Sequence, residues 1–133
     1  MLLILESSGG LNIWGHDDTD CDDGDLPYVK GDPVTAAGYA TYKARRAECG
    51  AQGVGPCQLT WPPHQDRADT LGGCWRPDIN CRVGFDILAG HLREHGTRDA
   101  FTLYNTGRTG PGPYAERAMA LLPRWQDVTS WTP

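Results

Sequence analysis

The stretch Leu2–Gly10, LLILESSGG, joins four aliphatic residues to a carboxylate, two small hydroxyl residues and two glycines. We predict a short helix over Leu2–Ser8 that ends where Gly9 and Gly10 allow a left-handed backbone. Glu6 then lies in the last helical turn, where the helix dipole and apolar surroundings both disfavour a negative charge. A glutamate that stays protonated near neutral pH is suited to act as a general acid. The alternative is an ordinary surface glutamate that follows a hydrophobic run.

The length and composition of the chain predict a single, loop-rich domain over residues 1–133. This length suffices for one core, and 17 Gly and 10 Pro imply many turns. Five Trp and five Tyr exclude a disordered chain. The net charge of -5 and the lack of a basic run argue against a nucleic-acid partner and against attraction to an anionic membrane surface.

The ends of the chain suggest a domain that belongs to a longer protein. The apolar start, residues 1–5, is too short for a transmembrane span and lacks the features of a signal peptide. Because the chain begins almost directly at Glu6, we expect a domain cut from a longer, multidomain chain. Trp131 is expected either to tether the C-terminal tail or to belong to a linker.

Apolar periodicity and capping residues predict a mainly α fold. The expected further helices cover residues 34–48, 65–71, from Asp78 or Asn80 to Glu94, 98–104 and 114–122. Asp32 and Pro33 open the first of these as cap and first-turn proline. In the helix that ends at Glu94, the apolar stripe is expected to comprise Val83, Ile87, Leu88 and Leu92. Residues 28–30 have room for one short strand, but no strand pair is evident.

The sequence contains two weak metal signals, and neither predicts a metal site. From Asp18 onward, alternate acids loosely resemble a calcium-binding EF-hand loop, but Asp23 stands at the obligatory glycine position and no glutamate closes the loop. We therefore expect a solvated acidic loop. His91 and His95 are four residues apart on a predicted helix, but no acidic partner motif accompanies them. No metal and no cofactor is expected.

Five cysteines leave at least one thiol free within a monomer. A bridge between Cys21 and Cys49 would pin the acidic loop against the helix over 34–48. Cys74 and Cys81 are close enough in sequence to bridge across a turn. With these two bridges, Cys57 is expected to be a buried free thiol, although four paired cysteines allow three connectivities.

Residues 53–60, GVGPCQLT, form a glycine-rich turn that carries a polar side chain. The glycines let the backbone turn sharply, Gln58 offers a donor and an acceptor, and Leu59 beside it is apolar. Three separated segments now stand in order: Glu6 followed by Ser7, the turn 53–60, and residues 103–107, LYNTG.

These segments resemble the three signature motifs of the lysozyme-like lytic transglycosylases, a family that includes goose-type lysozyme. The family pattern is a catalytic Glu followed by Ser, a Gly-Leu-Met-Gln-like turn, and an Ala-Tyr-Asn-x-Gly segment that closes a helix. The resemblance covers nearly the whole chain, with residues 18–50 as a loop-rich insert. Pro56 and Cys57 replace the usual residues before the glutamine, which is typical of a divergent member such as a phage endolysin module.

The resemblance implies a lysozyme-like fold and an enzyme that cuts the β-1,4 bond between N-acetylmuramic acid and N-acetylglucosamine in peptidoglycan. Glu6 would protonate the leaving oxygen. The implied substrate-binding residues are Ser7, Gly55, Gln58, Leu59, Tyr104 and Asn105. Tyr104 would bond Glu6 or the sugar. Trp14, Trp61 and Trp75 are candidates for stacking on sugar faces, with core packing as the alternative.

The resemblance also implies the biological setting of the chain. The partner would be the glycan strands of peptidoglycan, with a monomeric enzyme that relies on a separate wall-binding domain in the full-length chain. Such an enzyme is made in the host cytoplasm and reaches the cell wall after release, in phage-type lysis.

The position of a second carboxylate leaves the reaction outcome open. An inverting hydrolase needs a base about 6.5–9.5 Å from the acid to activate water. A transglycosylase lacks this base, and the sugar's own hydroxyl closes a 1,6-anhydro ring. Residues 14–17, WGHD, resemble the goose-type segment that carries an aspartate, so Asp17 or Asp18 is the candidate base. The rival functions are a non-catalytic cell-wall or calcium-binding module that uses the acidic loop, and a disulfide-rich structural domain with a degenerate site.

Overall fold

The computed structural model describes residues 1–129, and these residues are mainly helical, as predicted. The helices are α1 (Leu2–Ser7), α2 (Ala36–Cys49), α3 (Pro62–Thr70), α4 (Pro77–Glu94), α5 (Thr97–Thr106) and α6 (Pro113–Thr129), with a 3-10 turn, η1, at Asp23–Asp25. Over this part of the chain no strand forms, and backbone pairing outside helices includes two isolated bridges, Ile13 with Pro33 and Trp14 with Val54. Trp131 lies outside the described residues.

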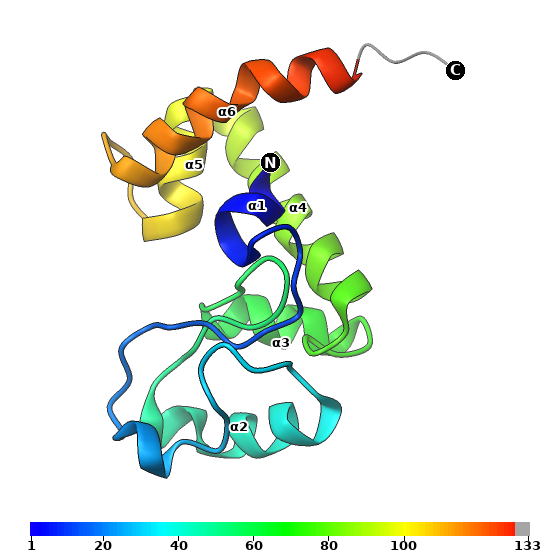
Figure 1. Ribbon diagram of the computed structural model, residues 1–133, viewed down its shortest axis with the longest axis vertical. Coiled ribbons are helices and arrows are strands. Elements are labelled where there is room, and N and C mark those ends of the chain that lie inside the picture. Colours follow the sequence, from blue (N-terminus) through cyan, green and yellow to red (C-terminus); the bar gives the residue numbers. More distant parts are fainter. Residues whose placement is uncertain (130–133) are drawn as a thin grey trace.

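The long helix α4 connects the two ends of the molecule (Figure 1). It contacts α5 at one end and α3 at the other, and α6 packs on both α5 and α1. Helix α2 and the long loops lie at the far end from α5 and α6, and α1 lies between these two parts (Figure 1). The short helix that carries Glu6 is therefore placed centrally. No helix within residues 1–129 is long and apolar enough to cross a membrane.

The helix boundaries follow the local sequence, with corrections at α2 and α4. Helices α3 and α4 begin at Pro62 and Pro77, whose missing N–H is harmless in the first turn. The predicted cap of α4, Asp78 or Asn80, is wrong, because both residues lie inside the helix and Arg76 precedes it. Helix α5 ends at Gly107, which adopts the left-handed conformation. The predicted cap Asp32 is wrong, because Thr35 caps α2 by accepting a hydrogen bond from the Gly38 N–H at 3.1 Å.

The core combines the apolar face of α4 with an aromatic cluster from the loops and α2. Val83, Ile87 and Leu88 are buried as predicted, whereas Leu92 is 43% exposed because the last turn of α4 has less protein against it. The short strand predicted at residues 28–30 does not form. Tyr28 instead stacks on Trp14, with ring centroids 4.4 Å apart.

The structure confirms one predicted disulfide and rejects the other. Cys21 and Cys49 are bridged, and the bridge attaches the acidic loop to the end of α2. Cys74 and Cys81 are not bridged, and both are free, as is Cys57, which was predicted to be a buried free thiol. Cys74 is buried beside Asn80, whereas Cys81 lies near Cys57 and contributes to the raised pKa of that thiol. The two thiols predicted to pair therefore have different neighbours.

Candidate active site

The three segments singled out by the sequence meet on one cavity of about 890 Å³. Glu6 from the last turn of α1, Gln58 from the glycine-rich turn, and Tyr104 from α5 all line it. The rest of the lining comprises His16, Asp17, Ala51, residues 59–62, His64, Ile87, His91, Leu103 and residues 105–107. A cavity of this volume is within the range of ligand-binding sites in proteins.

Glu6 is the most perturbed carboxyl at this site. Burial raises its pKa to about 7, and the negative charge of Asp17 acts in the same direction. The hydroxyl of Tyr114 donates a hydrogen bond to Glu6 Oε1, and this bond and the charge of Arg117 partly oppose the rise. Near neutral pH, the Glu6 side chain is therefore partly protonated and partly ionised. The raised pKa agrees with the prediction made from its apolar helix.

Tyr114 is a site residue to which the sequence analysis gave no role. It is the second residue of α6 and is 5% exposed. Burial and the neighbouring Glu6 raise the pKa of its hydroxyl, so the hydroxyl stays protonated and remains a donor. Its position beyond the third motif, at the start of a helix, was the only available signal.

Ser7 anchors α1 and does not face the cavity. Its hydroxyl donates to the carbonyl of Pro56 at 2.7 Å, and its exposed fraction is 3%. The helix then ends at Ser8, which adopts the left-handed conformation with φ of 53° ahead of the two predicted glycines. The bond from Ser7 thus joins the helix that carries Glu6 to the turn that carries Gln58. The geometry assigns Ser7 a structural position rather than the substrate contact that the resemblance implied.

The glycine-rich turn places Gln58 by means of close backbone contacts. Gln58 has a φ of 46°, and its Nε2 donates to the carbonyls of Ile13 at 3.1 Å and Gly55 at 2.8 Å. A Cβ at Gly15 or Gly53 would lie 2.6 or 2.5 Å from Gln58 Oε1, so a side chain at either position would displace the Gln58 amide. Leu59 lines the cavity beside Gln58 and is 3% exposed.

Gly55 shapes this turn from behind and does not line the cavity. It is buried with φ of 74°, and a Cβ there would lie 2.7 Å from Asn80 Nδ2. The Asn80 side chain in turn accepts from Cys57 N–H at 2.8 Å and donates to the Val54 carbonyl at 2.7 Å. Asn80, which the sequence analysis treated only as a helix cap, therefore ties α4 to the turn.

The two candidate bases are separated by the structure. Asp17 lines the same cavity as Glu6, and its Oδ2 accepts hydrogen bonds from the Gly53 N–H at 2.9 Å and from the Thr60 hydroxyl at 3.4 Å. Asp18 is exposed and does not line the cavity. Asp17 is therefore the carboxylate that shares the cavity with Glu6, and Asp18 belongs to the acidic loop.

Tyr104 and Asn105 both line the cavity, but Tyr104 does not bond Glu6. Its hydroxyl donates to the Cys57 carbonyl at 2.8 Å, and burial raises its pKa, which keeps this donor protonated. Asn105 is exposed at the end of α5. The resemblance suggested a bond from Tyr104 to Glu6 or the sugar, and the structure instead gives the bond with Glu6 to Tyr114.

Of the three candidate stacking tryptophans, Trp61 alone lines the cavity. Its side chain is 60% exposed and lies edge-on to His64, with ring centroids 4.7 Å apart. Trp14 is 2% exposed within the aromatic cluster, and Trp75 is partly buried against the core. An exposed aromatic face on a cavity rim is suited to stack on the apolar face of a sugar.

The acidic loop does not assemble a cation site. Over residues 1–129, the one group of at least three metal-ligating side chains is Cys21, Glu48 and Cys49, and its two sulfurs already form the disulfide. Asp23 forms an ion pair with Lys30 at 2.9 Å, and the described acids of this loop do not converge on a common centre. The geometry therefore gives no support to a calcium-binding module that uses this loop.

Comparison of the chain with protein-family models, with curated proteins and with solved structures gives no match. The cavity itself holds one carboxyl with a raised pKa, a second carboxylate that accepts a hydrogen bond from the Gly53 N–H, and an exposed aromatic ring at its rim.

Proposed function

We propose that the chain is a peptidoglycan-cleaving glycosidase that acts on the β-1,4 bond between N-acetylmuramic acid and N-acetylglucosamine. The observation that carries the proposal is the pairing of Glu6, whose pKa is raised to about 7, with Asp17 in one open cavity. Glycoside hydrolysis uses two carboxyl groups in one cavity, one of which is an acid with a raised pKa. The order of the three motifs supplies the substrate class.

In this proposal Glu6 is the general acid. It donates its proton to the leaving glycosidic oxygen while positive charge develops on the muramic acid sugar. Tyr114 holds the Glu6 side chain through a hydrogen bond and, as a neutral donor, adds no competing charge. Asn105, Leu59 and the rim at Trp61 line the cavity along which the glycan would lie.

Asp17 is proposed as the base that activates water, which makes hydrolysis the favoured outcome over 1,6-anhydro ring closure. Its Oδ2 accepts hydrogen bonds from the Gly53 N–H and the Thr60 hydroxyl, which hold the carboxylate in place at the cavity. The setting stays that of phage-type cell lysis, with peptidoglycan glycan strands as the partner and wall binding supplied by a separate domain.

Cleavage of purified peptidoglycan, followed as turbidity loss and by product mass, tests this proposal. Glu6→Gln should abolish cleavage, because the amide keeps the volume of the side chain but has no acidic proton. Asp17→Asn should lower hydrolysis by about 10²–10⁴-fold, whereas the matched neighbour Asp18→Asn should behave as the unaltered protein. Near-normal cleavage by Glu6→Gln would refute the assignment of the acid, and with it the proposed function.

Repeating the cleavage assay with a chelator distinguishes this proposal from a calcium-binding module that uses the acidic loop. Cleavage should be the same with and without a chelator of divalent cations, because neither proposed carboxyl role uses a cation. Products that are all one water lighter than hydrolysed ends would show ring closure, and the base role of Asp17 would then be wrong.

A further inference from the structure

The buried side chain of Gln52 hydrogen-bonds both the main-chain N–H and the main-chain carbonyl of Asp17. Gln52 has an exposed fraction of 0%. Its Oε1 accepts a hydrogen bond from the Asp17 N–H at 3.0 Å, and its Nε2 donates to the Asp17 carbonyl at 3.2 Å. The next residue, Gly53, donates its N–H to the Asp17 carboxylate at 2.9 Å. Two consecutive residues thus fix both the backbone and the carboxylate of an aspartate that is otherwise on an exposed loop.

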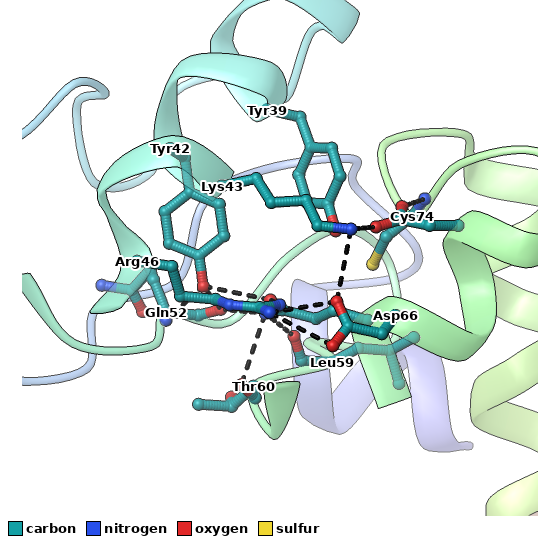
Figure 2. A network of polar contacts seen from close by, with 11 residues as sticks. Tyr39, Tyr42, Lys43, Arg46, Gln52, Leu59, Thr60, Asp66 and Cys74 are labelled. Atoms are coloured by element: carbon teal, nitrogen blue, oxygen red, sulfur yellow. Dashed lines mark hydrogen bonds and ion pairs between the residues drawn. The ribbon is translucent and has the colours of Figure 1, made fainter. Parts of the chain in front are cut away.

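Gln52 is itself held by a polar network between α2 and α3 (Figure 2). The Tyr42 hydroxyl accepts from the Gln52 N–H at 2.9 Å, and Gln65 Nε2 donates to the Gln52 carbonyl at 2.9 Å. Arg46 donates to Gln65 Oε1 at 2.9 Å and pairs with Asp66 at 3.0 Å. A buried polar network whose members are paired is rigid, because each unmade bond would leave a desolvated polar atom.

The rigidity of Asp17 matters because two reactions compete after the glycosidic bond breaks. In hydrolysis, Glu6 gives its proton to the leaving oxygen, the C1–oxygen bond breaks, and the oxygen of water bonds to C1 while Asp17 takes a proton from that water. In ring closure, the sugar's 6-hydroxyl oxygen bonds to C1, and the Glu6 carboxylate takes the hydroxyl proton. The first route needs a second carboxylate held in place as the base, whereas the second route needs only Glu6.

We propose that Gln52 is a positioning residue that sets the partition between hydrolysis and 1,6-anhydro ring closure, by holding Asp17 where it takes the proton from water. The inference rests on the proposed function. Gln52 lies outside the three motifs and does not line the cavity.

Gln52→Leu tests this role, because leucine fills the space but makes neither bond to Asp17. The assay is the full chain acting on purified peptidoglycan, with hydrolysed and anhydro ends counted by mass spectrometry. A displaced catalytic group costs up to about 10²-fold in rate, so we expect the ratio of anhydro to hydrolysed ends to rise about 10- to 100-fold. The kcat for hydrolysis should fall while KM stays near its original value, since the bonds lost are those from the Gln52 side chain to Asp17 and to Gly53, the residue that holds the Asp17 carboxylate.

Gln65→Leu is the matched control. Gln65 is also 0% exposed and belongs to the same network, but its amide bonds Tyr42, Arg46 and backbone carbonyls and not Asp17. It should lower the unfolding midpoint at least as much as Gln52→Leu but raise the ratio of anhydro to hydrolysed ends much less, because it removes a bond to the Gln52 carbonyl and leaves both side-chain bonds from Gln52 to Asp17 in place. If Gln52→Leu does not fold, Gln52→Glu takes its place, because it is isosteric and keeps only the acceptor for the Asp17 N–H.

The outcomes separate this inference from the function on which it rests. An unchanged product ratio in folded Gln52 variants, or an equal change in Gln65→Leu, would overturn the positioning role. Exclusively anhydro products from the unaltered protein would also overturn it, while leaving peptidoglycan cleavage intact. Full activity of Glu6→Gln, by contrast, would reject the proposed function itself.

Discussion

Replacing Glu6 by glutamine should make the protein more stable at neutral pH while it removes the proposed catalytic acid. Folding raises the pKa of Glu6 from 4.5 to about 7. The folded state therefore keeps a proton that the unfolded chain releases, and the unfolding free energy falls as pH rises through this window. Below pH 4.5 both states are protonated and this cost is absent, and above pH 7 it is present in full.

The pKa change sets the size of the effect. Because a tenfold change in a protonation equilibrium is worth about 1.4 kcal/mol, the full cost is about 3 kcal/mol. Contact of the carboxyl with water in the open cavity reduces it to about 2–3 kcal/mol. Glutamine has no charge to desolvate, and its oxygen still accepts the hydrogen bond from Tyr114. The stability of Glu6→Gln relative to the unaltered protein should therefore increase by about 2–3 kcal/mol between pH 4 and pH 8.

Urea unfolding followed by tryptophan fluorescence, at several values between pH 4 and pH 8, measures this difference. The value at pH 4 serves as the baseline, because it contains any change in packing but not the ionisation cost. Glu94→Gln, at an exposed carboxylate of α4 that does not line the cavity, controls for the loss of one negative charge. A difference that stays constant with pH would show that folding does not raise the pKa of Glu6, and the argument for a general acid would lose its physical basis.

Three further outcomes are expected. The kcat/KM for peptidoglycan cleavage should fall as pH rises above about 7, where Glu6 loses its proton, and a constant kcat/KM up to pH 9 would contradict this. Gly15→Ala should lower cleavage sharply, because the added Cβ would lie 2.6 Å from Gln58 Oε1 and 2.7 Å from Gln52 Oε1, and unchanged kinetics would mean that the positions of these two side chains are unimportant. Replacing both Cys21 and Cys49 by serine should lower the unfolding free energy by about 3–4 kcal/mol, since the bridge spans 28 residues. Thiol titration of the denatured, unreduced protein should find three free thiols, and a count of one would restore a second bridge.

The sequence was sufficient for most of the helices and for the raised pKa of Glu6, because both depend on local patterns. Apolar periodicity identified α4, and the aliphatic run before Glu6 predicted a carboxyl with a raised pKa, which the structure bears out. The first turn of α2 was misjudged because Asp32 and Thr35 are both good caps, and only the backbone geometry shows that Thr35 accepts the bond from Gly38.

The contacts between distant segments were beyond the reach of the sequence. Asp17 and Asp18 are adjacent and chemically identical, and the choice between them depends on the backbone N–H of Gly53, which is 36 residues away from Asp17. Gln52 carries no motif, since a buried glutamine beside a glycine has no distinctive pattern. Cysteine pairing failed for the same reason, because sequence spacing favoured Cys74 with Cys81 while the fold directs their side chains to different neighbours.

The helix that carries Glu6 has only six residues, which is too short to persist by itself. Its position depends on the bond from Ser7 to Pro56, on the contact with α6, and on the bond from Tyr114. A local opening that releases α1 would thus remove Glu6 from the cavity while most of the helices stay folded. On heating, the proposed cleavage activity would therefore be lost at a lower temperature than the helical circular-dichroism signal, because activity depends on the stability of this short segment.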